Sequence, residues 1–388
     1  MSATVSRSHL TAGFSNCVRE DVAIGNKWLA GLSFLALSSC TEASNSLDYA
    51  SCERPLGEVR LNELQSIGSH NSYKLAIPEL EMDFIRLQAP DLAETLDYAH
   101  IPLAEQLDLG MRQLELDVFH DPVGGRFADP LLPKLASTNP GAEPFDAAGY
   151  DQPGLKVMHI QDIDQRSQCV LFIECLQEID AWSGENPDHT PILILINAKQ
   201  APIGIPGATE ALPFDAAAFD GMDGELLSVL SADRLITPDD LRGDAASLRE
   251  GVLENGWPLI EQGKGKFLFA LDEPEIVVET YMRGNASLEG LPLFVNSVDP
   301  SANHAAYFTI NDPKTDQDRI REIVSSGFLV RTRADADTAE ARANDTSRLE
   351  AALTSGAQYI STDYYLPREE FGLYKAALPN DEVSRCRP

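Results

Sequence analysis

The clearest indicator of fold class in this sequence is the stretch Pro191-Ile192-Leu193-Ile194-Leu195-Ile196-Asn197-Ala198-Lys199. Five consecutive aliphatic residues are followed at once by polar ones. A short segment that is apolar on both faces is typical of a parallel strand covered by helices on both sides of its sheet. This stretch therefore predicts an α/β protein with parallel strands.

Similar short apolar runs alternate with helical patterns along the rest of the chain. The helical patterns are clearest at Thr315–Ser325 and Thr338–Ser355, and the second ends at Gly356, a typical helix stop. Strands that alternate with helices in this way predict a single (β/α)8 TIM-type barrel, and a doubly wound open sheet is the alternative. The eight predicted strands are Leu61–Ser69, Met111–Phe119, Leu155–Ile160, Pro191–Lys199, Lys266–Asp272, Leu293–Val298, Phe328–Arg333 and Gln358–Asp363.

Two long insertions follow the second and fourth predicted strands. They are Asp121–Gly154, which is rich in Pro, Gly and Ala, and Gln200–Gly265, which carries a helical stretch. Loops of this length in a compact barrel are usually functional lids or disordered segments. In a barrel both insertions would rise from the face where the strands end.

The charge of the chain excludes some partners. With 61 acidic and 30 basic residues, the formal net charge is −31. Nucleic-acid binding needs a basic surface, so nucleic-acid partners are not expected. Electrostatic attraction to anionic lipid is not expected either.

The N-terminal segment predicts export and lipidation. Lys27 precedes the apolar run Trp28–Leu37, which is too short to span a bilayer, and Leu37-Ser38-Ser39-Cys40 follows the cleavage pattern of a lipoprotein signal. We expect residues 1–39 to be a signal peptide, Cys40 to carry lipid, residues 40–54 to be a tether, and residues 55–388 to be one domain. The expected location is the cell envelope, and the expected state is a monomer. The alternatives are an ordinary secretory signal or a disordered tail.

The remaining cysteines fit an oxidising compartment. Cys52, Cys169, Cys175 and Cys386 remain once Cys17 leaves with the signal and Cys40 carries lipid. Four such thiols suggest two disulfides, for which three pairings exist. We favour a local Cys169–Cys175 bridge and a Cys52–Cys386 bridge that joins the two ends of the domain. The spacing does not suggest a zinc site.

Polar side chains gather where the predicted strands end, and in a parallel barrel those ends meet at one mouth. Two histidines, two acids spaced by two residues, two amides, a lysine and two arginines at one mouth suit cleavage of a phosphodiester. The candidate residues are His70, Asn71, Glu115, Asp117, His159, Asn197, Lys199, Arg331, Arg333 and Asp363.

Glu115 and Asp117 carry the strongest signal in this set. Their spacing directs both carboxylates to the same face of a strand. Unpaired acids in a buried apolar strand are costly, which favours a bound cation over a surface ion pair. Calcium prefers oxygen ligands, which here would include Asn71, and imidazoles can transfer protons near neutral pH. Arg331 and Arg333 are equally well explained as ion-pair partners of acids.

These residues resemble the phosphoinositide-specific phospholipases C, above all the bacterial calcium-dependent branch. The motifs that carry the resemblance are Gly68–Tyr73, Leu114–Asp117, Lys156–Asp164, Val330–Asp335 and Tyr359–Tyr364. Together they cover nearly the whole predicted domain.

The resemblance implies a TIM-type barrel, one Ca²⁺ ion, and a phospholipid substrate attacked by its inositol 2-hydroxyl to give diacylglycerol and a cyclic inositol phosphate. By the same resemblance, His70 and His159 would be the catalytic pair. Asn71, Glu115, Asp117 and Asn197 would bind calcium. Lys199, Arg331, Arg333 and Asp363 are the candidate substrate-binding residues.

One position departs from the family pattern. Asn197 stands two residues before Lys199, where the family carries a glutamate that binds calcium. The site thereby loses one negative charge, so weaker calcium binding is expected. Two alternative functions stay open: a glycerophosphodiester phosphodiesterase, although Asn71 stands where that family usually has arginine, and a surface lipoprotein that binds a ligand without turnover.

Overall fold

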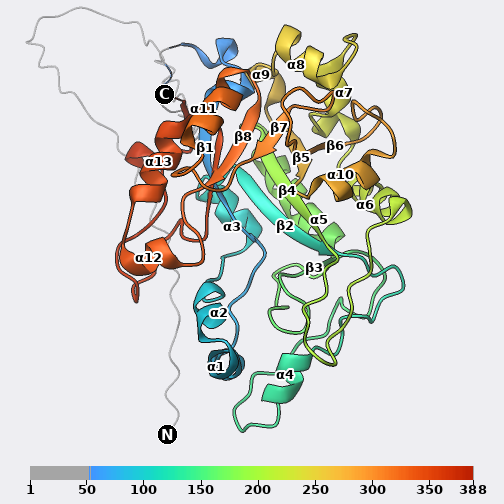
Figure 1. Ribbon diagram of the computed structural model, residues 1–388, viewed down its shortest axis with the longest axis vertical. Coiled ribbons are helices and arrows are strands. Elements are labelled where there is room, and N and C mark those ends of the chain that lie inside the picture. Colours follow the sequence, from blue (N-terminus) through green and yellow to red (C-terminus); the bar gives the residue numbers. More distant parts are fainter. Residues whose placement is uncertain (1–51, 53, 388) are drawn as a thin grey trace, which may run out of the picture. The chain divides into compact units, whose positions relative to one another are not determined.

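The computed structural model describes residue 52 and residues 54–387 (Figure 1). The predicted signal peptide, the lipidation at Cys40 and most of the predicted tether lie outside this part of the chain. Within it, no helix is long and apolar enough to cross a bilayer.

The strands of the described residues form two five-stranded sheets. All neighbouring strands run parallel except β3 and β10, which pair antiparallel with β2 and β1. In one sheet the order is β10 (Ser384–Cys386), β1 (Leu64–Ser69), β9 (Tyr359–Thr362), β8 (Leu329–Arg333) and β7 (Tyr307–Thr309). In the other it is β3 (Lys156–Val157), β2 (Gln113–Phe119), β4 (Ile192–Lys199), β5 (Phe267–Leu271) and β6 (Leu293–Val295).

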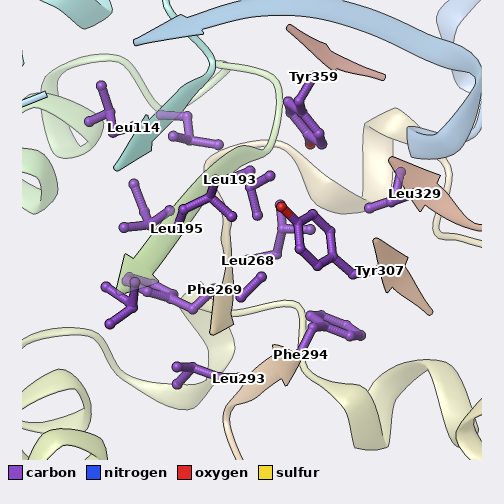
Figure 2. Close-up of a cluster of buried hydrophobic side chains, with 14 of the residues drawn as sticks. Leu114, Leu193, Leu195, Leu268, Phe269, Leu293, Phe294, Tyr307, Leu329 and Tyr359 are labelled. Atoms are coloured by element: carbon purple, nitrogen blue, oxygen red, sulfur yellow. The ribbon is translucent and has the colours of Figure 1, made fainter. Parts of the chain in front are cut away.

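The two sheets share one hydrophobic core. Figure 2 shows Leu114 of β2 and Leu193 of β4 in the same buried cluster as Tyr307 of β7 and Tyr359 of β9. A parallel bridge between Asn296 and Tyr307 joins β6 to β7. These observations confirm the α/β class. A single closed barrel is not confirmed, because the ladder of hydrogen bonds is interrupted between the sheets.

The seam between β1 and β2 depends on a glycine. The Arg112 N–H donates to the Ile67 carbonyl at 2.9 Å, and Gln113 Nε2 donates to the Ser69 carbonyl at 3.0 Å. A Cβ on Gly68 would lie 2.6 Å from the Gln113 carbonyl oxygen, which is closer than real atoms approach. Only a residue without a side chain allows the two strands to lie this close.

We therefore expect Gly68→Ala to destabilise the fold by about 1–3 kcal/mol, the usual cost of overpacking a core. Urea unfolding would measure the change. Gly224→Ala is the control, because Gly224 lies in a helix with nothing within 4 Å of an added Cβ. That variant should be slightly more stable, and a Gly68→Ala protein as stable as the parent would contradict the proposed strand contact.

Helices surround the strands (Figure 1). α11 and α13 pack against β8 and against each other, while α3, α5, α6 and α10 contact one another in that order along the chain. The α-helices are α1 (Glu79–Gln88), α2 (Pro90–Thr95), α3 (Leu103–Asp108), α4 (Leu131–Ala136), α5 (Phe172–Glu185), α6 (Ala216–Val229), α7 (Pro238–Arg242), α8 (Leu248–Asn255), α9 (Ile260–Gly263), α10 (Glu275–Met282), α11 (Gln317–Ser325), α12 (Ala339–Ala343) and α13 (Ser347–Ser355). Short 3-10 turns lie at Leu56–Glu58, Leu61–Glu63, Ala232–Arg234 and Pro379–Asp381.

Local sequence explains several helix ends. α6 begins after Asp215, whose carboxylate accepts the Ala218 N–H at 2.9 Å, and α13 ends at Gly356, as predicted, with φ of 84°. The predicted helix Thr338–Ser355 is divided in two, because Asn344 adopts a left-handed conformation with φ of 50°.

One strand prediction was wrong, and two short strands, β7 and β10, were missed. The segment Leu155–Ile160 is not a parallel barrel strand: only Lys156 and Val157 pair, antiparallel to β2, and the chain then turns through Asp162, which has φ of 67°. β7 was missed because its three residues, Tyr307–Thr309, are too few to show a period.

The two insertions differ in structure. From Ala216 onward the second insertion contains α6, α7, α8 and α9, so the prediction of a long loop holds only for residues 200–215. The first insertion holds α4, which packs with α1 and α2 on a small separate hydrophobic cluster that includes Met82, Leu96 and Leu132.

Both favoured disulfides are present. Cys52 pairs with Cys386 at an S–S distance of 2.02 Å, and Cys169 pairs with Cys175 at 2.06 Å. The first bridge fixes the beginning of the domain to β10 at its end.

Candidate active site

His70 follows β1 directly, and its ring is held from two sides. Nδ1 lies 2.8 Å from Asp363 Oδ1, and Asp363 follows β9, the neighbour of β1. The ring stacks on Tyr98 with centroids 6.2 Å apart. Burial, together with the Arg333 guanidinium, holds the pKa of His70 well below its usual value. Because the carboxylate takes the Nδ1–H, Nε2 is the nitrogen left for chemistry, and it lies 3.7 Å from Glu115 Oε1.

His159 has the same kind of support from different elements. Its Nδ1 lies 2.8 Å from Asp164 Oδ2, and the fully buried Lys74 ammonium lies 3.3 Å from the same oxygen. Lys74 also donates to the Tyr98 carbonyl at 2.7 Å. The His159 ring meets the Tyr98 ring edge-on, with centroids 6.3 Å apart. Tyr98 therefore lies between two imidazoles that each carry a carboxylate on Nδ1.

The two acids of β2 lie beside these imidazoles. Glu115 accepts from Asn197 Nδ2 at 3.0 Å on one oxygen and from Arg331 at 2.7 Å on the other. The β2–β4 register pairs Asp117 with Asn197. Lys199 Nζ forms an ion pair with Asp117 Oδ2 at 3.0 Å, and apart from this contact neither oxygen of the fully buried carboxylate has a hydrogen-bond partner among the described residues. Both acids share one face of the site, as predicted.

Asn71 is held next to β2 by its backbone and its amide. It adopts a left-handed conformation with φ of 49°, and its Nδ2 donates to the Tyr98 hydroxyl at 2.6 Å. The following residue, Ser72, donates its N–H to the Glu115 carbonyl at 3.0 Å. The predicted ligand Asn71 thus lies close to Glu115 in the fold although it comes from another strand.

The four predicted calcium ligands fit a hard cation by chemistry. Two carboxylates and two amides offer only oxygen to a metal, and the unmet acceptors of Asp117 leave capacity for one. The charge of the acids is balanced by Arg331, which is 2% exposed, and by Lys199, whose side chain is 37% exposed. Among the residues that the structure describes, no three His, Cys, Asp or Glu side chains form a metal-binding cluster, so Asn71 and Asn197 would have to take part.

A pocket of about 470 Å³ opens beside His159; apolar side chains such as Phe119 and Ile203 share its lining with amide and charged side chains, for which it is called the polar pocket. Asn197, Lys199, Asp272 and Glu273 line it. Burial raises the pKa of Asp272 to about 6 and that of Glu273 to about 7. The Ala198 N–H donates to Glu273 at 2.6 Å, which fixes this carboxyl at the pocket wall. The pocket can thus offer hydrogen-bonding groups to a hydroxylated ligand.

The remaining predicted residues are also in this network. Arg333 donates to Asp363 at 3.1 Å, so both arginines are ion-paired to acids, as the alternative interpretation held. Asp363 uses one oxygen for His70 and the other for Arg333. Both of its oxygens are therefore engaged, which does not suit its predicted role as a substrate-binding residue.

Sequence reasoning missed several residues of the site. Asp164 lies five positions after His159 within a motif already noted, but nothing in its spacing marked it as the partner of that histidine. Lys74, Tyr98 and Glu273 gave no signal, because their roles depend on contacts between distant segments. His100, which was not among the candidates, donates from Nε2 to the His70 carbonyl at 2.7 Å and so supports the loop that carries His70.

Paired imidazoles beside buried acids on an α/β fold suit the cleavage of a phosphodiester. The family described as "Phosphoinositide phospholipase C, Ca2+-dependent" matches residues 59–388, and the chain belongs to this family. The protein is thus an enzyme of the phosphoric diester hydrolase class, and its family is calcium-dependent.

Solved structures support the fold. The chain is similar to a calcium-dependent phosphoinositol-specific phospholipase C from the Gram-negative bacterium Pseudomonas sp, with 16% identity and a TM-score of 0.52, over 86% of this chain and 99% of that one. A myoinositol complex of a protein with the same description matches over the same shares with a TM-score of 0.50 and 16% identity. No curated protein matches the chain.

Proposed function

We propose that this enzyme is a calcium-dependent phospholipase C that cleaves an inositol phospholipid by attack of the inositol 2-hydroxyl on the phosphodiester. The products would be diacylglycerol and a cyclic inositol phosphate. The observation that carries this proposal is the pair of imidazoles against Tyr98, each with a carboxylate on Nδ1, and the 3.7 Å between His70 Nε2 and Glu115.

The chain's own residues have defined tasks in this proposal. With Nδ1 of each histidine engaged, one Nε2 accepts the proton of the attacking hydroxyl and the other returns a proton to the leaving alkoxide. Lys199 is placed to attract the phosphate at the polar pocket. Asp363 orients His70. Arg331 and Arg333 hold Glu115 and Asp363 in position.

One Ca²⁺ ion would be held by Asn71, Glu115, Asp117 and Asn197. When bound, it would neutralise phosphate oxygens and acidify the attacking hydroxyl. We also propose that the two sheets act as one (β/α)8 barrel scaffold, which the shared core and the bridge between β6 and β7 support.

Turnover of a panel of inositol phospholipids, with and without calcium, tests the proposal, and phosphorus NMR identifies the product. A cyclic inositol phosphate that forms only with calcium is the expected result. Release of glycerol phosphate from glycerophosphoinositol, the deacylated substrate, without a cyclic product would instead assign a glycerophosphodiester phosphodiesterase. A protein that binds calcium and head groups but turns over no lipid would be the non-catalytic lipoprotein.

Asn197→Glu should tighten calcium binding, because it restores a negative charge to the proposed ligand set. The same change removes the hydrogen bond to Glu115 and sets two carboxylates side by side, so the variant should melt at a lower temperature than the parent when calcium is absent. Calorimetry and thermal unfolding measure the two effects. Unchanged calcium affinity would count against Asn197 as a ligand.

We further propose that the protein is a monomer anchored to the cell envelope through lipid on Cys40. Several acyl chains hold a protein at a membrane more firmly than one chain does, and the acidic charge of the chain offers no electrostatic substitute. Cys40→Ser should therefore release the protein from membranes in a sedimentation assay. If the variant still sediments with membranes, the lipoprotein proposal is wrong.

A further inference from the structure

A second pocket, of about 370 Å³, lies where the loop after β1, the helices α1 and α2, and the loop after β9 meet. Its volume is in the range of small-molecule sites, which are mostly apolar with a few polar groups. Apolar and aromatic side chains make up most of its lining, among them Ile77, Met82, Leu96, Tyr98, Tyr365 and Leu366.

This apolar pocket and the polar pocket flank the imidazole pair. Asp363, the carboxylate partner of His70, lines the apolar pocket, and His159 lines the polar one. Tyr98, which contacts both imidazoles, forms part of the apolar wall. A molecule with a polar end and an apolar end could therefore place one end in each pocket with its middle near the two histidines.

The polar groups of the apolar pocket are already engaged. Arg368 donates to Asp97 Oδ1 at 2.8 Å, and His100 donates from Nε2 to the His70 carbonyl at 2.7 Å. Neither group is set up to bind an anion. The loop residue Leu366, which is 44% exposed, extends the apolar surface outward. The pocket thus suits a hydrocarbon chain rather than a phosphate or a second sugar.

We propose that the apolar pocket binds an acyl chain of the lipid substrate while the head group occupies the polar pocket. This inference rests on the proposed function and adds to it a place for the lipid part of the substrate. Its consequence is a preference for chain length in monomeric substrates, because each buried methylene strengthens binding roughly fourfold.

The first test is binding without turnover. Calorimetry below the micellar range would compare dihexanoylglycerol, a neutral molecule without phosphate, with dibutyroylglycerol. We expect the longer chain to bind more tightly by roughly fourfold for each methylene that enters the pocket. Ile77→Asp, which puts a charge into the pocket, and Ala99→Trp, which fills it, should both remove this difference.

The matched control is Leu87→Asp. Leu87 lies on α1, the helix that supplies Met82 to the pocket, and is 78% exposed outside the lining. This variant should keep the full preference for the longer chain. Equal binding of both glycerides to the parent protein, or a preference that survives in both pocket variants, would overturn the proposal. Circular dichroism would verify that each variant is folded.

The second test separates this inference from the proposed function. In the parent enzyme, kcat/KM for monomeric dihexanoyl and dibutyroyl phosphatidylinositol should differ as the glyceride affinities do. Hydrolysis of both lipids at equal kcat/KM would leave the function standing and reject the pocket. Chain-dependent glyceride binding without hydrolysis of any inositol phospholipid would keep the pocket and reject the function.

Discussion

Replacement of His70 by alanine is expected to lower kcat for inositol phospholipid cleavage by roughly 10²–10⁴-fold. This is the rate factor that one positioned acid or base usually contributes by proton transfer. Asp363 occupies Nδ1 of the His70 imidazole, so Nε2 is the nitrogen left to transfer the proton. Because the phosphate would be held mainly by other groups, KM should change much less. Initial rates at saturating calcium measure both constants.

His304→Ala is the matched control, because His304 makes no contact with the network around Glu115 and should keep the activity of the parent. The melting temperature of both variants shows whether a loss of rate reflects a loss of fold. A His70→Ala enzyme that retains more than about a tenth of the kcat of the parent would rule out proton transfer by this residue.

Glu115→Ala is expected to destabilise the protein by about 3–5 kcal/mol, because it leaves the Arg331 guanidinium buried without its charge partner. The two groups are 2.7 Å apart with side chains 5% and 2% exposed. Urea unfolding without calcium would measure the change. Glu115→Gln should lower the free energy of unfolding by less, since an amide oxygen still accepts a hydrogen bond from the guanidinium.

Two further variants test the cause of this loss. Arg331→Met combined with Glu115→Leu removes both charges and should recover most of the lost stability, although not activity. Arg86→Ala removes an exposed ion pair with Glu79 and should cost at most about 1 kcal/mol. A Glu115→Ala protein that is as stable as Arg86→Ala would show that the buried pair does not contribute as the structure suggests.

The sequence predicted some strands closely and others poorly, for a physical reason. Pro191–Lys199 was predicted within one residue of β4, because an unbroken aliphatic run leaves few alternatives to a buried strand. β3 and β7 have two and three residues, and such short segments are strands only because neighbours supply their hydrogen bonds. Their direction and existence cannot be derived from local pattern.

The prediction of the candidate site succeeded and failed for the same reason: features set by local spacing were predicted, and contacts between distant segments were not. The spacing of Glu115 and Asp117 was enough to place both acids on one face, and the short loop between Cys169 and Cys175 favoured the bridge that forms. The sequence favoured a cation as the partner of these acids, and it could not show that Arg331 pairs with Glu115, because the two residues are 216 positions apart.

Residue types and their local periods therefore predicted the α/β class and the strand ends at which polar side chains gather, since strand burial and side-chain direction depend on immediate neighbours. The family followed from the resemblance of the motifs, which the family match confirms. Only the tertiary structure decided which carboxylate holds which histidine, that Tyr98 lies between them, and that an apolar pocket adjoins Asp363. These contacts join segments that are far apart in the chain, and their distances follow from the packing of the two sheets and the loops above them.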